Sequence, residues 1–104
     1  MLNETEFLKV AEDELNALED WLEEAADVEC LRAGHVLTIE LDDGRQVVAN
    51  IQTPMKEIWF ASPFGGRHFA RSDAGDWLDT RDGRSLRAVV AEALGRMDVE
   101  LSDE

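Results

Sequence analysis

Carboxylates on the N-terminal segment are the side chains of this sequence with the clearest chemical potential. At helical spacing they form two neighbouring rows, with Glu12, Glu19 and Glu23 in one row and Asp13, Asp20 and Glu24 in the other. Asp27 and Glu29 extend this charge, and Lys9 is the only basic side chain from Met1 to Glu29. Carboxylates spaced in this way can share a hard cation weakly and with little selectivity, or attract a basic protein surface.

A second candidate surface combines a tryptophan with two amides on one face of a predicted sheet. Because successive strand residues point to opposite faces, burial of Ile58 and Phe60 would leave Trp59 on the open face. The same alternation leaves Asn50 and Gln52 outside on the preceding strand, where antiparallel pairing would bring them to Trp59. An exposed tryptophan at such a place indicates partner binding, whereas the amides could equally satisfy nearby turn backbone.

Two amphipathic helices flank the strands. Residues 3–25 are predicted to form the first, with Asn3 and Glu6 as a capping box. Its apolar stripe is Phe7, Leu8, Ala11, Leu15, Leu18 and Leu22. Residues 86–97, capped by Ser85, are predicted to form the second. Each pair of like charges one turn apart on the first helix lowers the stability of the helix by roughly a few tenths of a kcal/mol. A helix with mixed charges would avoid this loss.

The intervening chain reads as short strands joined by tight turns. The strands are expected at 28–31, 35–41, 45–52, 57–62, 67–70 and 76–80. The turns are expected at Ala33-Gly34, Asp42-Asp43-Gly44, Thr53-Pro54 and Gly65-Gly66. This order predicts an α+β two-layer sandwich, with an antiparallel sheet of about six strands and both helices packed on one face. The length of 104 residues fits a single domain over 1–104.

Composition narrows the class of partner. The net charge is −14, from 24 acidic and 10 basic residues, which argues against nucleic acid and favours a monomer in the absence of metal. Cys30 is the only cysteine, so we expect no internal disulfide, a reducing compartment and a small buried side chain. With neither a signal peptide nor a long apolar run, the sequence predicts a cytoplasmic protein without membrane contact.

The remaining aromatic residues and histidines have structural interpretations. We expect Trp77 in the core and Trp21 at the flank of the first helix. His35 and His68 are too far apart in the sequence to form a metal motif by themselves.

Several ordered blocks of the sequence resemble the frataxin family, and within it the bacterial CyaY branch. The blocks are Glu6-Phe7, Gly34–Ile39 (GHVLTI), Asn50–Pro54 (NIQTP), Ile58–Ser62 (IWFAS) and Gly65–Phe69 (GGRHF). Any one block is weak, but their order, between an acidic helix and a C-terminal helix, is specific and covers nearly the whole chain. The resemblance implies a frataxin-like fold.

The resemblance also implies a function: an iron-binding accessory protein of iron–sulfur cluster assembly. Such a protein would act as an iron donor to, or an iron-dependent regulator of, the cysteine desulfurase and scaffold machinery, with no catalytic residue. The implied metal ligands, binding Fe²⁺ or Fe³⁺ weakly, are Glu12, Glu19, Asp20, Glu23, Glu24, Asp27 and Glu29, with His68 as an additional ligand. The implied partner-binding residues are Glu19, Asp20, Glu23, Asn50, Gln52 and Trp59.

Two alternatives stay open at this point. The first is an enzyme, a ferroxidase that oxidises Fe²⁺ and stores Fe³⁺ in iron-dependent oligomers. The second is an acidic protein-docking module whose activity does not depend on metal. Oxygen consumption by the isolated protein would favour the first. Weaker partner binding after charge reversal, with no effect of metal on the activity of the complex, would favour the second.

Overall fold

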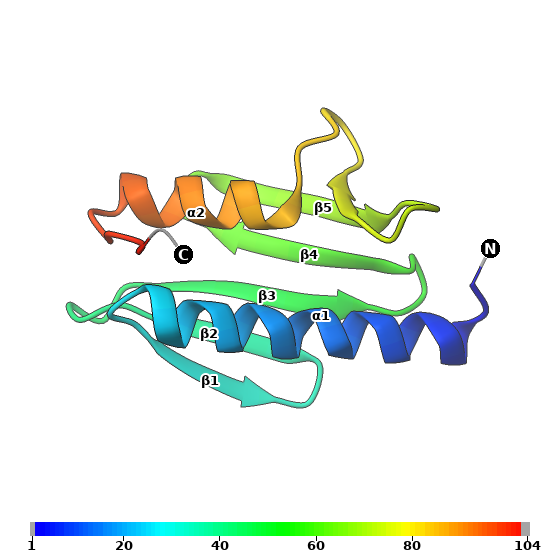
Figure 1. Cartoon of the computed structure of the whole chain (residues 1–104), viewed down its shortest axis with the longest axis horizontal. Coiled ribbons are helices and arrows are strands. Elements are labelled where there is room, and N and C mark those ends of the chain that lie inside the picture. The colour runs from blue at the N-terminus through cyan, green and yellow to red at the C-terminus, as the bar shows by residue number, and fades with distance from the viewer. Residues whose placement is uncertain (1, 103–104) are drawn as a thin grey trace.

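The computed structural model describes residues 2–102, in which helices flank a run of strands (Figure 1). The elements in order are α1 (Glu4–Ala25), β1 (Glu29–Ala33), β2 (Val36–Glu40), β3 (Gln46–Gln52), β4 (Glu57–Ser62), β5 (Gly65–Arg71), β6 (Trp77–Asp79) and α2 (Leu86–Arg96). The strands form one six-stranded antiparallel sheet in chain order. Both helices lie on the same side of this sheet (Figure 1), so the predicted α+β sandwich is confirmed.

Both helices begin as the sequence predicts. The Asn3 side chain accepts a hydrogen bond from the Glu6 N–H at 2.8 Å, and the Glu6 carboxylate accepts one from the Asn3 N–H at 3.0 Å. The Ser85 hydroxyl accepts from the Ala88 N–H at 3.2 Å. These contacts satisfy donors that the first helical turn leaves free. No helix within residues 2–102 has the length and apolar character needed to cross a membrane.

The core lies between the helices and the inner face of the sheet. α1 buries Phe7, Ala11, Leu15, Leu18, Leu22 and Ala25, and α2 buries Leu86, Val89, Val90, Ala93 and Leu94. The sheet contributes alternate residues, including Leu37, Ile39, Val47, Ala49, Ile51, Ile58, Phe60 and Phe69. Trp77 is buried against Phe7 at a ring-centroid distance of 6.1 Å, which confirms its predicted place. The opposite sheet face carries no helix within the described residues.

Two turns differ from the sequence prediction. Gly34 and His35 form the turn between β1 and β2, so Ala33 belongs to the strand and His35 does not. Pro63 and Phe64, not the glycine pair, form the turn between β4 and β5. Gly65 has a φ of +120°, which side-chain-bearing residues rarely adopt, and this freedom lets pairing with Ser62 begin immediately after the turn.

Cys30 is half-buried, so the prediction of a buried side chain was wrong. Its strand, β1, is the edge of the sheet, and only one neighbouring strand covers it. Trp21 is half-buried at the flank of α1, as predicted, with the Arg87 guanidinium 5.5 Å from its ring centroid.

One buried ion pair holds the segment that leads into α2. The Asp79 side chain is 1% exposed and accepts a hydrogen bond from the Arg67 guanidinium, which also reaches Asp82 at 2.7 Å. The second Asp79 oxygen accepts from the backbone N–H groups of Arg81 and Asp82. Burial by itself would raise the pKa of Asp79, but these hydrogen bonds outweigh it and hold the pKa below its ordinary value.

Asp79→Asn should lower the free energy of unfolding by about 3–5 kcal/mol, because it leaves the Arg67 charge without its buried partner. Since the folded-state pKa is below the ordinary 3.8, this stabilisation is fully present well above that pH. It should disappear as the pH falls through the lower folded value. Urea denaturation across pH measures both effects. Asp82→Asn, which changes the exposed partner of Arg67, should lower the free energy of unfolding by under about 1 kcal/mol. An equal loss for the two variants would contradict this assignment.

Candidate functional site

One row of α1 carboxylates lies along the edge strand β1. At one end Glu12 lies 3.3 Å from the His35 imidazole, and one turn further Asn16 accepts a hydrogen bond from the Arg32 guanidinium at 2.6 Å. Glu19 and Glu23 continue the same helical row. We call Glu12, Glu19, Glu23 and Asp27 the acidic seam, because they follow the line where α1 meets β1.

The Cys30 thiol reports the electrostatics of this seam. Burial first, and then the negative charges of Glu23 and Glu19, raise its pKa to about 11. The thiol therefore stays protonated at neutral pH when no metal ion is bound. Cys30 lies on the helix side of the sheet, since its cross-strand partner Ile39 is buried in the core.

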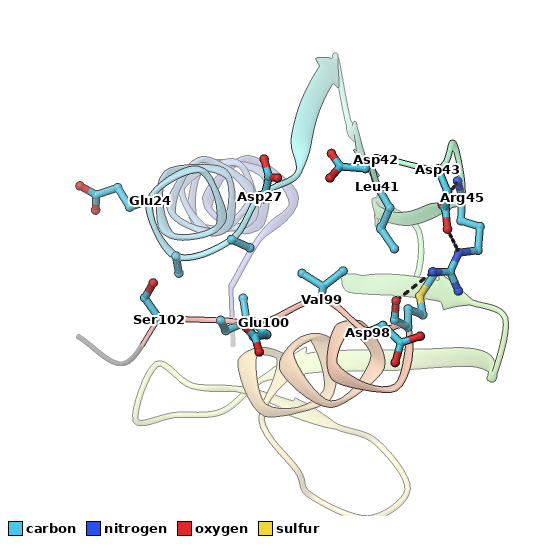
Figure 2. A pocket seen from close by; sticks show the side chains of 14 residues that line it. Glu24, Asp27, Leu41, Asp42, Asp43, Arg45, Asp98, Val99, Glu100 and Ser102 are labelled. Atoms are coloured by element: carbon cyan, nitrogen blue, oxygen red, sulfur yellow. Dashed lines mark hydrogen bonds and ion pairs between the residues drawn. The ribbon is translucent and has the colours of Figure 1, made fainter.

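The other predicted metal ligands lie apart from the seam. Asp20 and Glu24 are exposed on the neighbouring row, and Glu24 points away from the groove in Figure 2. Glu29 belongs to the opposite sheet face, because the next residue along its strand faces the helices. The predicted ligands therefore lie on three separate surfaces: the acidic seam, the neighbouring row of α1 and the opposite face of the sheet.

The carboxylates of this region lack basic partners. Within residues 2–102, no Lys or Arg lies within ion-pair distance of Glu19, Asp20, Glu23, Glu24, Asp27 or Glu29. Arg45, Arg67, Arg84 and Arg87 pair with acidic residues elsewhere. In the same part of the chain, no three His, Cys, Asp or Glu side chains converge on a metal-binding geometry. The region is an uncompensated charged surface rather than a closed cage.

An open groove of about 1000 Å³ continues the seam past the end of α1 (Figure 2). Asp27 on one wall and Asp42 on the other point toward each other. The negative charge of Asp27 raises the pKa of Asp42. Two carboxylates that face each other repel, and a cation between them would relieve this repulsion. Sequence reasoning missed Asp42 as a site residue, because nothing local shows that the β2–β3 turn returns to the end of α1.

On the opposite sheet face, Trp59 is half-buried against its neighbours. Its indole N–H donates to Glu57 at 2.8 Å, and its ring stacks on His68 with a centroid distance of 4.3 Å and an interplanar angle of 9°. The His68 imidazole also lies 3.5 Å from the Glu57 carboxylate. These contacts hold the indole in one orientation. Glu57 was missed as a member of this group, although strand alternation already places it on the same face as Trp59.

The predicted amides lie beside this tryptophan. Asn50 is the cross-strand partner of Trp59, and Gln52 is the partner of Glu57. The Asn50 side-chain oxygen is buried and has no hydrogen-bond partner among residues 2–102. His68 belongs to this face, so the structure does not bring it to the α1 carboxylates with which it was predicted to act.

Comparisons with known proteins agree on one family. Residues 1–98 match the model of the frataxin-like domain. The chain is 42% identical to the iron-sulfur cluster assembly protein CyaY of Ralstonia pickettii, across 97% of this chain and 94% of that protein. It is 49% identical to the CyaY protein of Ralstonia nicotianae, across 86% of this chain and 83% of that one.

Solved structures give the same result. The fold is similar to that of frataxin from Psychromonas ingrahamii, with a TM-score of 0.88 and 26% identity over 97% of each chain. It is also similar to trimeric frataxin from the yeast Saccharomyces cerevisiae complexed with ferrous iron, with a TM-score of 0.68 and 34% identity. That match covers 84% of this chain and 83% of the yeast chain.

Trp59→Ala should lower the free energy of unfolding by about 1–2 kcal/mol, because this indole packs on the open face and not in the core. The matched variant Trp77→Ala should cost about 3–5 kcal/mol, since that side chain is buried against Phe7. Urea denaturation of both variants measures the difference. Equal costs would show that Trp59 is a structural residue and not a surface one.

Proposed function

The chain belongs to the frataxin family, and on this premise we propose that it is an iron-binding accessory protein of iron–sulfur cluster assembly. Its relatives in Ralstonia are iron-sulfur cluster assembly proteins by name, and a yeast family member has been crystallised with ferrous iron. In this proposal the protein delivers iron to the cysteine desulfurase and scaffold machinery, or regulates the desulfurase in response to iron. Iron is the cargo of the protein.

The observation that carries the proposal is the lack of basic partners, within residues 2–102, around Glu19, Asp20, Glu23 and Glu24 of α1. Glu19 with Glu23, and Asp20 with Glu24, are like charges one helical turn apart, and each pair destabilises the helix by a few tenths of a kcal/mol, roughly. No ion pair within residues 2–102 relieves them. A divalent cation near either pair would convert this repulsion into attraction, so the helix is arranged to gain from cation binding.

The geometry favours weak and reversible binding. Ferrous iron accepts carboxylate oxygens readily, but a surface that offers only pairs of ligands leaves water on the remaining positions. Asp27 and Asp42 face each other across the groove, and a cation between them would relieve the repulsion that raises the pKa of Asp42. Ions held in this way can pass to an acceptor with better ligands, as delivery requires.

The same charge supports docking to a basic partner surface. Carboxylates without local partners project a negative field that raises the association rate of a basic protein at low salt. On the open sheet face, Trp59 offers a rigid aromatic anchor, since Glu57 and His68 already fix its orientation. Asn50 and Gln52 beside it supply amide groups for hydrogen bonds to the partner.

Replacing Glu19 and Glu23 together by Gln should weaken binding to the cysteine desulfurase by about tenfold at low salt, mainly through the association rate. Surface plasmon resonance at several salt concentrations measures both rates. The matched control is Glu4→Gln with Asp73→Asn, which makes the same change in net charge at exposed positions away from the seam.

An equal loss in both double variants would assign the effect to net charge alone. No loss in the seam variant would remove Glu19 and Glu23 from the contact. If desulfurase binding depends on the seam but added Fe²⁺ changes neither binding nor cluster assembly, the metal-independent docking module becomes the better description. Oxygen consumption by the isolated protein with Fe²⁺ would instead identify a ferroxidase.

A further inference from the structure

The two edges of the sheet are protected differently. At the β6 edge the chain itself supplies partners: Leu78 bridges to Ser85, and the Asp79 N–H donates to the Arg84 carbonyl at 2.7 Å. At the other edge, β1 is the outermost element of the described chain (Figure 1). An uncovered edge strand presents a row of backbone donors and acceptors to any strand that approaches.

The hydrogen-bond register identifies which backbone groups are free. The Ile51 N–H donates to the His35 carbonyl at 2.9 Å, and the Leu41 N–H donates to the Arg45 carbonyl at 2.8 Å. In an antiparallel ladder the bonding direction alternates by residue, so Leu37 and Ile39 also bond toward β3.

The residues that alternate with Leu37 and Ile39 in β2, such as Thr38, therefore bond toward β1, where Thr38 pairs with Leu31. By the same alternation, Cys30 and Arg32 direct their N–H and C=O groups away from the sheet. No hydrogen bond within residues 2–102 reaches these groups.

Side chains on the two sides of this edge differ in chemistry. On the helix side Glu19 and Glu23 lie close enough to Cys30 to raise the pKa of its thiol. On the open side Leu31 is 47% exposed, and Val36 on the neighbouring strand is 38% exposed. A strand added beside Cys30 and Leu31 would place one side chain near Glu19 and Glu23 and the next against Leu31.

We propose that the open edge of β1 binds an extended segment of a partner protein as an added strand, in which basic and apolar residues alternate. The residue that pairs with Cys30 directs its backbone at β1 and its side chain toward Glu19 and Glu23, so this position takes Lys or Arg. The neighbour that pairs with Leu31 takes an apolar side chain, and the neighbour on the other side lies beside the exposed Glu29. Backbone hydrogen bonds supply the affinity, and the alternation supplies the specificity.

A second copy of this chain is a poor occupant of the same edge. Each copy carries a net charge of −14, and pairing of β1 with β1 would bring the Glu19 and Glu23 rows of both copies together. A basic segment removes this repulsion and neutralises carboxylates that have no partner within residues 2–102. The inference rests on the proposed function in that the segment belongs to the basic partner of the acidic seam.

The test is amide hydrogen exchange of the full chain, followed by NMR, with a synthetic peptide of alternating lysine and valine. Saturating peptide should slow exchange at the Cys30 and Arg32 amides by about tenfold or more, because they gain hydrogen bonds. The Leu31 and Ala33 amides, already bonded to β2, should change little. The matched control is the same peptide with its lysine residues methylated at the backbone nitrogen. These residues cannot donate a backbone hydrogen bond to β1, so this peptide should give no protection.

Two results would overturn the added strand: no binding at millimolar peptide, or binding that shifts the Glu19 and Glu23 signals without slowing the Cys30 and Arg32 amides. The desulfurase experiment separates this failure from failure of the proposed function. If the Glu19 and Glu23 variant still loses desulfurase affinity, only the added strand is rejected. If that affinity is also unchanged, docking at the seam is rejected as well.

Discussion

The burial of a single apolar stripe on α1 is the constraint on which the rest of the structure depends. Phe7, Leu15 and Leu22 are each at most 2% exposed, which fixes the rotation of the helix against the sheet. Once this rotation is fixed, the row that contains Glu19 must follow β1, because helical geometry leaves it nowhere else. The hydrophobic core thus determines where the negative charge of the molecule is displayed.

Basic residues are used where they hold the fold and not where they would neutralise that charge. Arg67 pairs with buried Asp79, Arg84 with Glu92, and Arg45 reaches both Asp43 and the carbonyl of Met97. The one arginine of β1 bonds to an amide, that of Asn16. Stabilising ion pairs are therefore concentrated around the sheet turns and α2. Binding of a cation or a basic partner would restore the stability that α1 loses through like-charge repulsion.

Local rules predicted the elements and the faces, whereas contacts between distant segments could not be predicted. The Asn3 and Glu6 cap, the period-two strands and the outward direction of Trp59 follow from spacing alone. The approach of Asp42 to Asp27 depends on where a hairpin turn ends in space, and no sequence period encodes it. The stacking of His68 on Trp59 depends on strand register, which the sequence fixes only after the β4–β5 turn has been identified correctly.

An anaerobic NMR titration of the labelled protein with Fe²⁺ would show whether the unpaired carboxylates beside β1 hold iron. Paramagnetic broadening should begin at Glu19, Glu23, Asp27 and Asp42, while the signals of Trp59 and His68 on the opposite face stay sharp. Uniform broadening, or no selective broadening at millimolar iron, would contradict iron binding at these carboxylates. The acidic seam would then be a docking surface for protein alone.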